Sequence, residues 1–250
     1  MASDQPPPPD VGQKLDAWLE SPGWEVRNAA VKLIARFRDQ GRYHRLLQRL
    51  ADPSEAGIVR RNAAEAIARL GLATPPARVA LVRALSDPYW EVRSEALVAL
   101  ASLFPPAEDI ERALLELLFG PPHGPRRWVR EENFEVRMAC ARGLGHLGAS
   151  RAAFEALVAL AEDDFWLVRS QAAVALAHFA TRCSEYLAEA RDRLRRIDRL
   201  SEGAISYFVH RDVLSQVFRA LDTAPEEGVA PEQLRALYLN PSEGWNHLRR

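Results

Sequence analysis

The chain is poor in cysteine, which excludes a scaffold held together by disulfide bonds. Its two cysteines, Cys140 and Cys183, form no C-x-x-C pair, so the sequence offers no structural zinc site. It also lacks a run of about 18 apolar residues, and this absence excludes a membrane-spanning helix. The first ten residues, MASDQPPPPD, have neither the basic start nor the apolar stretch of a secretory signal. We therefore expect a cytoplasmic protein.

An excess of charge of one sign is missing too. The formal net charge is −1, which gives no overall attraction to nucleic acid or to an anionic membrane. The sequence contains no P-loop, no glycine-rich dinucleotide motif, no H-E-x-x-H and no nucleophile elbow. Hydrophobic residues make up 48% of the chain, enough for a packed core. We expect a folded, non-catalytic protein with no metal or cofactor, and with neither nucleic acid nor a membrane as its partner.

What the sequence does contain is an internal repeat. Five segments carry a Val-Arg pair followed by small and apolar residues. The arginines of these pairs lie 33, 33, 44 and 32 residues apart, and the three similar spacings indicate one repeating structural unit. These five arginines, called the arginine ladder below, are Arg27, Arg60, Arg93, Arg137 and Arg169.

The repeat has the hydrophobic periodicity of a helix. Positions 3, 7 and 10 residues after each arginine are apolar in every copy, and such spacing places them on one stripe of an α-helix. Other apolar-periodic segments lie before or between the copies: 13–19, 42–50, 77–85, 110–119 and 152–161. Each repeat is therefore predicted to be two antiparallel helices, an A helix and then a B helix that begins at the Val-Arg pair. Neither can bury its stripe alone, so we predict an all-α, right-handed α-α superhelical solenoid of five to six helical hairpins.

The sequence also suggests bounds for this solenoid. The Pro-rich residues 1–10 are predicted to be disordered, and residues 11–221 to form the repeats. The spacing of 44 places an inserted loop at residues 120–131. Residues 184–200 and 205–221 are expected to be the last helices of the array. Residues 222–250 are expected to form a C-terminal cap and tail, with a short helix at 231–239.

The order of an acidic residue, an aromatic residue, Val-Arg and then small residues resembles the phycobilisome-lyase type of HEAT repeat. The resemblance covers residues 12–221 and recurs five times. It implies a helical solenoid. The lyase members of that group handle bilin chromophores or their acceptor proteins, so a bilin-lyase-like role stays open as an alternative. Similarity of fold alone does not transfer this role.

The arginine ladder allows two interpretations. The arginines could grip an acidic ligand, or each could pair with an acid between helices. We favour the second, because a residue needed equally in every repeat is usually needed by the repeat itself. The acids predicted as partners are Glu25, Asp87, Glu91, Glu135 and Asp164.

The face of the B helices opposite the core stripe is the predicted partner-binding surface. Positions 1, 5 and 9 after each arginine form this B-helix face, and they are rich in basic residues. A charged face can be merely solvated. Its serine, valine and methionine positions suit a protein partner better than a phosphate backbone. The residues predicted to bind are Lys32, Arg36, Arg61, Arg69, Arg142, His146 and His178.

The inserted loop adds Arg126, Arg127 and Trp128 to the predicted partner-binding residues. Arginine and tryptophan dominate binding hot spots, although the tryptophan could instead fold back onto the repeats. His146 and His178 share one offset in adjacent repeats, but helix spacing of about 8–10 Å makes their convergence on one metal ion improbable.

Two enzymatic HEAT-like families were weighed against the scaffold. Deoxyhypusine hydroxylases carry His-Glu pairs that bind iron, and this sequence has no His-Glu dipeptide. DNA-alkylation-repair glycosylases use aromatic residues in a basic cleft, and Trp24, Trp90 and Trp166 invite that comparison. These tryptophans share one repeat offset, so we predict that they pack between repeats. The sequence therefore favours a non-catalytic scaffold or adaptor that binds a partner protein along the concave face of the solenoid.

Overall fold

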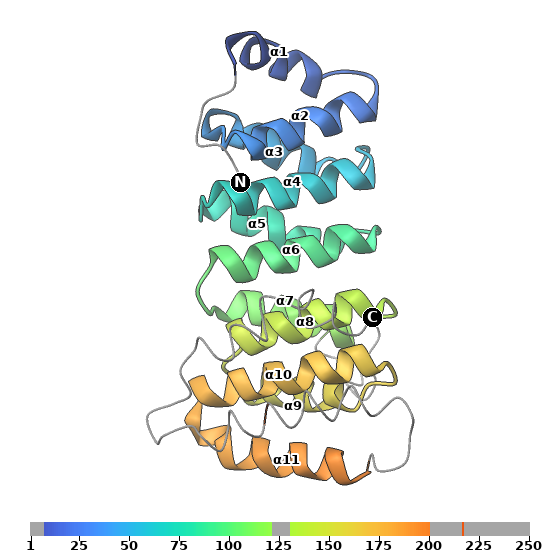
Figure 1. Cartoon of the computed structure of the whole chain (residues 1–250), viewed down its shortest axis with the longest axis vertical. Coiled ribbons are helices and arrows are strands. Elements are labelled where there is room, and N and C mark those ends of the chain that lie inside the picture. Colours follow the sequence, from blue (N-terminus) through green and yellow to red (C-terminus); the bar gives the residue numbers. More distant parts are fainter. Residues whose placement is uncertain (1–7, 122–130, 201–216, 218–250) are drawn as a thin grey trace, which may run out of the picture. The chain divides into compact units, whose positions relative to one another are not determined.

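The computed structural model describes residues 8–121, 131–200 and 217, and all regular structure in this part of the chain is helical (Figure 1). The chain divides into two compact units, residues 1–105 and residues 106–250. The sequence analysis predicted one array over residues 11–221. The division falls at Pro105 and Pro106, between two helices, where consecutive prolines end a helix because they lack the backbone N–H group.

The first unit contains three pairs of helices. The A helices are α1 (Pro9–Leu19), α3 (Tyr43–Ala51) and α5 (Pro75–Ala84), and the B helices are α2 (Trp24–Arg36), α4 (Gly57–Leu70) and α6 (Trp90–Leu103). A 3-10 turn, η1 (Gln40–Arg42), precedes α3. Among the B helices, α4 packs against both α2 and α6. Among the A helices, α3 packs against α5. This is the layered packing of a helical repeat array.

The second unit continues the alternation of A and B helices. It contains α7 (Glu108–Phe119), α8 (Phe134–Leu147), α9 (Arg151–Ala161) and α10 (Trp166–Arg182). A 3-10 turn, η2 (Ser184–Tyr186), leads into α11 (Leu187–Leu200). The B helices α8 and α10 pack closely on one another. The predicted all-α repeat solenoid is confirmed at this level.

The core of each unit includes most of the stripe that the sequence pattern predicted; at the position ten residues after the arginine, Phe37 and Leu103 are only half-buried. The residues three and seven positions after each ladder arginine are fully buried in all five B helices. The small residue at the first of these positions lets a neighbouring helix approach. Helices α8 and α10 approach closely at Gly145, where a Cβ atom would stand 2.8 Å from the carbonyl oxygen of Ala175. Glycine is therefore required there by packing.

The predicted helices agree with the described ones to within two residues, except at the starts of α1 and α11; residues 184–186 form the 3-10 turn η2 before α11. Helix α1 begins at Pro9 rather than at residue 13, because proline fits the first turn of a helix, where its missing N–H group is not needed. Helix α5 begins at Pro75 because the side chain of Thr74 accepts a hydrogen bond from Ala77 N–H.

Several predicted segments lie outside the described residues. These are residues 1–7, residues 122–130 of the inserted loop, the segment 231–239, and the segment 205–221 apart from Val217. Val217 is helical and buried. Among the helices that the structure describes, none combines the length and the hydropathy needed to cross a membrane.

Candidate functional site

The arginine ladder joins consecutive repeats through buried ion pairs. Three of its members bind a carboxylate of the following repeat through Nε and Nη2 together, which is the bidentate geometry that favours arginine over lysine. The paired distances are 2.7 and 2.6 Å for Arg27–Glu55, 2.6 and 2.8 Å for Arg60–Asp87, and 2.8 and 2.9 Å for Arg137–Asp163.

The third nitrogen of each guanidinium binds the turn of its own repeat. Nη1 of Arg27 donates to the carbonyl oxygens of Ser21 and Pro22 at 2.7 and 3.0 Å. The same group makes the equivalent contacts in the other four ladder arginines: Arg60 to Glu55; Arg93 to Asp87 and Pro88; Arg137 to Glu131 and Glu132; Arg169 to Asp163 and Asp164. Each arginine therefore orders the turn before its own helix, and three are shown to bind the next turn as well.

The acid partners of the ladder have a second role. Asp87 accepts a hydrogen bond from Tyr89 N–H at 2.8 Å, and Asp163 accepts one from Phe165 N–H at 2.9 Å. Glu55 accepts one from Ala56 N–H at 2.8 Å. These bonds order the entry of a B helix that has no side-chain cap of its own.

The partners differ from most of those predicted. Asp87, the partner of Arg60, is among the predicted acids. Arg27 and Arg137 instead bind Glu55 and Asp163, which were not predicted. A signal for them exists in the sequence. An acid lies five or six residues before each of the last four ladder arginines, as Glu55, Asp87, Glu131 and Asp163.

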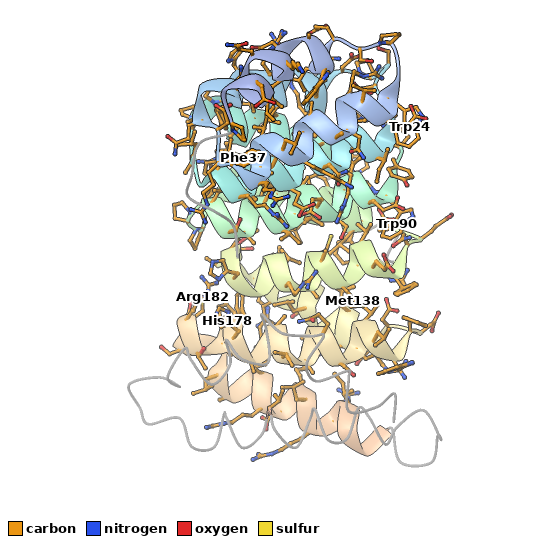
Figure 2. All side chains as sticks on the ribbon, turned by 45° about the horizontal axis from the view of Figure 1, so that its top comes forward. Trp24, Phe37, Trp90, Met138, His178 and Arg182 are labelled. Carbon is orange, nitrogen blue, oxygen red and sulfur yellow. The ribbon has the colours of Figure 1, made fainter. Side chains whose placement is uncertain are left out.

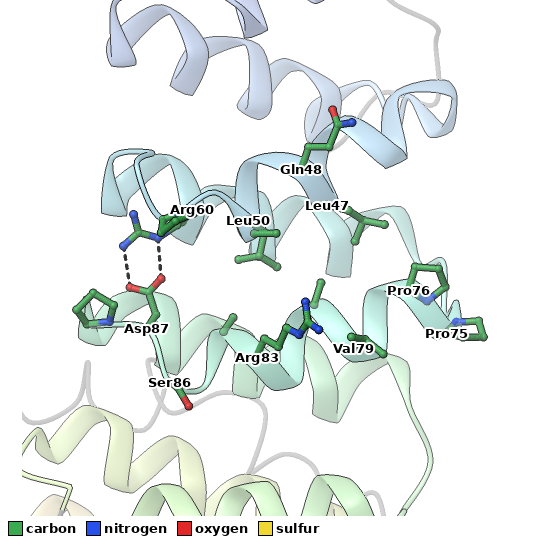
Figure 3. A pocket seen from close by; sticks show the side chains of 15 residues that line it. Leu47, Gln48, Leu50, Arg60, Pro75, Pro76, Val79, Arg83, Ser86 and Asp87 are labelled. Atoms are coloured by element: carbon green, nitrogen blue, oxygen red, sulfur yellow. Dashed lines mark hydrogen bonds and ion pairs between the residues drawn. The ribbon is translucent and has the colours of Figure 1, made fainter.

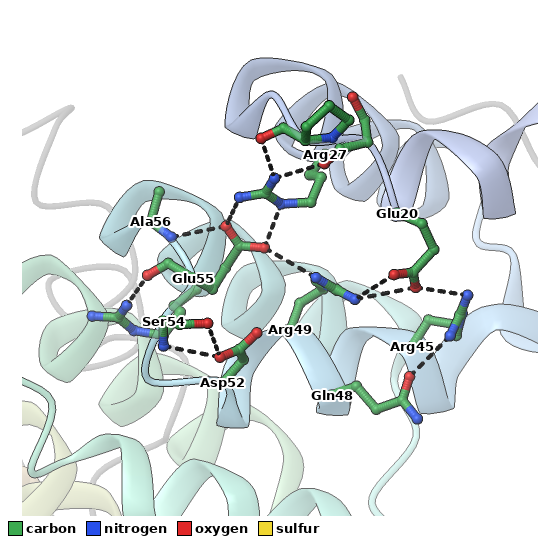
Figure 4. A network of polar contacts seen from close by, with 12 residues as sticks. Glu20, Arg27, Arg45, Gln48, Arg49, Asp52, Ser54, Glu55 and Ala56 are labelled. Atoms are coloured by element: carbon green, nitrogen blue, oxygen red, sulfur yellow. Dashed lines mark hydrogen bonds and ion pairs between the residues drawn. The ribbon is translucent and has the colours of Figure 1, made fainter.

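Electrostatics hold the ladder in its charged form (Figure 4). Burial by itself would raise the pKa of Glu55, but hydrogen bonds from Arg27 and from the Ala56 N–H group outweigh it and keep that pKa below its usual value. Hydrogen bonding to Asp87 raises the pKa of Arg60 further. Glu55 also accepts a bond from Arg49 at 3.4 Å, and Arg49 in turn binds Glu20 at 3.1 Å. The carboxylate of Glu55 is therefore engaged inside the fold, whereas the side chain of Glu20 is 53% exposed.

The B-helix face of the first unit is partly neutralised. Arg61 lies 3.4 Å from Glu65 and 3.3 Å from Glu95, and Arg69 lies 2.6 Å from Glu65. Burial raises the pKa of Glu95, although the charge of Arg61 opposes this shift. Three of the four residues in this cluster belong to one helix, α4, and the fourth, Glu95, belongs to α6.

Helix α2 presents the cations of this face that are not neutralised. Lys32 and Arg36 are exposed, and neither makes an ion pair with any described residue. The guanidinium of Arg36 lies 5.9 Å from the centre of the Phe37 ring. On α6, Val98 is 41% exposed at the equivalent offset. The face therefore combines free positive charge with an exposed aliphatic side chain.

In the second unit, two of the three described residues that were predicted to bind, Arg142 and His178, are half-buried. His146 is exposed and stacks on His178, with ring centres 5.8 Å apart. Nδ1 of His178 lies 2.9 Å from the carbonyl oxygen of Gly145. Burial lowers the pKa of His178, and the charge of Arg182 lowers it further, against the opposing effect of the Gly145 bond. Arg142 is half-buried, and within the described residues no group of three potential ligands could hold a metal ion.

The prediction that the tryptophans pack between repeats fails for Trp24, whereas Phe134, which has the same repeat offset, does contact the next repeat. Phe134 contacts Phe165 of the next repeat, with ring centres 4.3 Å apart. Trp24, by contrast, is 43% exposed, and Figure 2 places it on the same edge of the first unit as Trp90. The loop residues Arg126, Arg127 and Trp128 lie outside the described residues.

A groove that the sequence analysis missed lies on the A-helix layer of the first unit (Figure 3). It runs between α3 and α5 and has a volume of about 700 Å³. Most of its lining is aliphatic: Leu47, Leu50, Pro53, Pro75, Pro76 and Val79. Sequence reasoning could not find it, because the same residue types would equally be buried in a core.

Two layers of paired helices joined by recurring arginine–carboxylate clamps define a helical repeat protein. The family model for HEAT repeats matches residues 12–118 and 127–202. The chain belongs to the HEAT repeat family, as the sequence pattern predicted.

Two solved structures match the chain at low sequence identity. The crystal structure of an engineered protein matches at 21% identity with a TM-score of 0.53, covering 86% of this chain and 97% of that one. The complex of CpcE and CpcF of phycocyanin lyase from a Nostoc species matches at 18% identity with a TM-score of 0.41, covering 87% of this chain and 97% of that one. Likenesses at these identities describe the fold alone. None of the curated proteins matches the chain.

Proposed function

We propose that this protein is a non-catalytic scaffold that binds a partner protein, and that the partner presents an acidic segment to the B-helix face of the first unit. The observation that carries the proposal is the pair of exposed cations on α2. Neither Lys32 nor Arg36 makes an ion pair with an acid among the described residues. An acidic segment would supply the missing carboxylates.

The rest of this face supports the same kind of partner. Arg61 and Arg69 share two carboxylates on α4 and α6, so a further carboxylate would complete their hydrogen bonding. Val98 offers an apolar contact, and apolar anchors supply much of the affinity of protein interfaces. A partner with acidic and apolar residues matches this surface better than a nucleic acid backbone does.

The mechanism is binding on a rigid frame, with no bond made or broken. The ladder clamps keep the B helices of the first unit in register, so the cations of successive repeats are held ready before the partner arrives. Preorganisation of this kind lowers the entropic cost of binding. Both cysteines are free thiols, which suits a reducing compartment and supports the proposed cytoplasmic location.

The test is a double charge reversal on α2. The variant Lys32→Glu/Arg36→Glu should lose capture of its partner from a host lysate by about tenfold or more, while its thermal melt stays unchanged. The matched control is Arg112→Glu/Arg196→Glu, which changes the net charge equally at two exposed arginines on α7 and α11, outside this face and outside the groove between α3 and α5.

The results separate the site from general electrostatics. If both double variants lose the partner equally, net charge rather than the B-helix face drives capture. If the α2 variant still captures the partner at wild-type yield, the proposed face is wrong. Capture by the wild type should also weaken as salt is raised, because exposed charges are screened over about 8–10 Å at physiological ionic strength.

A further inference from the structure

We infer that the groove between α3 and α5 is a second docking site, and that its occupant is a short amphipathic helix of a partner protein that carries an acidic residue. This inference goes beyond the proposed function, because the groove lies on the A-helix layer. The proposed acidic segment binds the B-helix face. The two sites share no residue, so each can fail without the other.

The lining of the groove favours an apolar occupant. Val79 on α5 is 53% exposed, the highest exposure among the large hydrophobic residues that the structure describes. Leu47 on α3 is only half-buried, and Figure 3 shows both side chains directed into the space between the two helices. Val79 and the exposed part of Leu47 face one another across the groove. An apolar side chain that enters between them would remove both from water, which is favourable.

The backbone of the groove favours a helix over an extended peptide. Its two long walls are helices, whose backbone groups already bond to one another. Its lining also includes Pro75 and Pro76 in the first turn of α5 and Pro53 and Pro88 in the adjoining turns, none of which has an N–H group to donate. An extended peptide would bury its own backbone groups without partners, whereas a helix brings them already paired.

The dimensions agree with a helix of a few turns. The walls α3 and α5 have 9 and 10 residues, and a helical rise of about 1.5 Å per residue makes the groove roughly 15 Å long. An entering helix of about ten residues would match that length, and apolar residues at positions i, i+3, i+4 and i+7 would form a continuous contact.

The charge in the groove specifies the acidic residue. The groove is lined by two arginines. Arg60 is closed off by its bidentate pair with Asp87. Arg83 is exposed and makes no ion pair with a described residue, and Figure 3 shows it between Val79 and Asp87. A carboxylate on the occupant would bind Arg83 at the edge of the apolar contact, where partial exclusion of water strengthens the pair.

Three labelled peptides test the proposal by fluorescence anisotropy with the full chain. The first is an amphipathic peptide of about twelve residues with leucines at i, i+3, i+4 and i+7 and a glutamate on the flank. The second replaces the glutamate with lysine. The third places a proline at the centre of the first, which prevents a helix while keeping the leucines. The protein variants are Val79→Asp and Arg83→Glu, with Val98→Asp and Arg36→Glu as matched controls on the B-helix face.

The proposal requires the glutamate peptide to bind the wild type. Val79→Asp should weaken this binding by about tenfold or more, and the two control variants should leave it unchanged. Arg83→Glu should weaken the glutamate peptide and strengthen the lysine peptide, because the charges are then exchanged across the contact. The proline peptide should bind at least about tenfold more weakly.

Other outcomes overturn the proposal. Failure of the glutamate peptide to bind, or equal binding to the wild type and Val79→Asp, removes the groove as a docking site. Equal binding of the proline peptide shows an extended occupant. If Val98→Asp or Arg36→Glu abolishes peptide binding and Val79→Asp does not, the peptide binds the B-helix face. This inference would then fail, while the proposed function would stand.

Discussion

Replacing Arg60 should destabilise the first unit far more than replacing Arg83, an exposed arginine of α5. The Arg60 and Asp87 side chains are 7% and 9% exposed, and two short hydrogen bonds join them. Arg60→Met keeps most of the side-chain volume but leaves the carboxylate of Asp87 buried without its partner. The loss of one member of a buried pair costs about 3–5 kcal/mol in the free energy of unfolding. Tyr89 N–H still bonds Asp87, so we expect the lower end, about 3 kcal/mol.

A double-mutant cycle gives the coupling energy of the pair. Asp87→Asn keeps the bond to Tyr89 N–H but removes the charge that Arg60 needs, and it should also destabilise the fold. The double variant Arg60→Met/Asp87→Asn leaves no buried unpaired charge, so its loss should be smaller than the sum of the two single losses by about 1–3 kcal/mol.

Urea unfolding followed by circular dichroism measures these losses, with the slope of each transition checked against the wild type. The control Arg83→Met removes an exposed arginine of α5 that has no ion pair with a described residue, and it should change stability by under about 0.5 kcal/mol. If Arg60→Met costs no more than Arg83→Met, the ladder does not hold the repeats together, and the reasoning about recurring arginines is refuted.

Two further predictions concern the contact between α8 and α10. Gly145→Ala should lower stability by about 1–3 kcal/mol, because its Cβ atom would lie 2.8 Å from the backbone oxygen of Ala175; a higher melting temperature would contradict this. His178 has a lowered pKa, so the unfolded chain takes up its proton at a higher pH than the folded chain does. The stability that neutral His178 contributes is therefore present above the usual pKa of 6.5 and is lost as the pH falls below it. The difference in melting temperature between wild type and His178→Gln should shrink from about pH 7 to about pH 5, and a constant difference would exclude this role for His178.

The ladder shows how far a repeating pattern can be interpreted. The arginines were recognised as a structural row because they recur at one offset, and recurrence is visible in the sequence. Their partners were mostly misassigned. Glu55 lies 28 residues after Arg27 and Asp163 lies 26 residues after Arg137, so no rule about neighbouring residues connects them.

The B-helix face shows the same limit in another form. The sequence predicted that these positions share the side of each B helix opposite the core stripe, but on α10 Ser170 and Val174 of this set are buried. From the sequence, the four basic residues of the first unit were all predicted to bind the partner: Lys32, Arg36, Arg61 and Arg69. The structure separates them, because Glu65 and Glu95 neutralise the two on α4, while the two on α2 make no ion pair with a described residue.

The sequence by itself determined the helices, their order and their buried stripes. These depend on spacings of three and four residues, which a single helix enforces locally. Only the tertiary structure decided which acid meets which arginine, which cations keep their charge unpaired, and where a groove opens between α3 and α5. Each of these depends on atoms that lie about thirty residues apart in the chain and meet only when one repeat packs on the next.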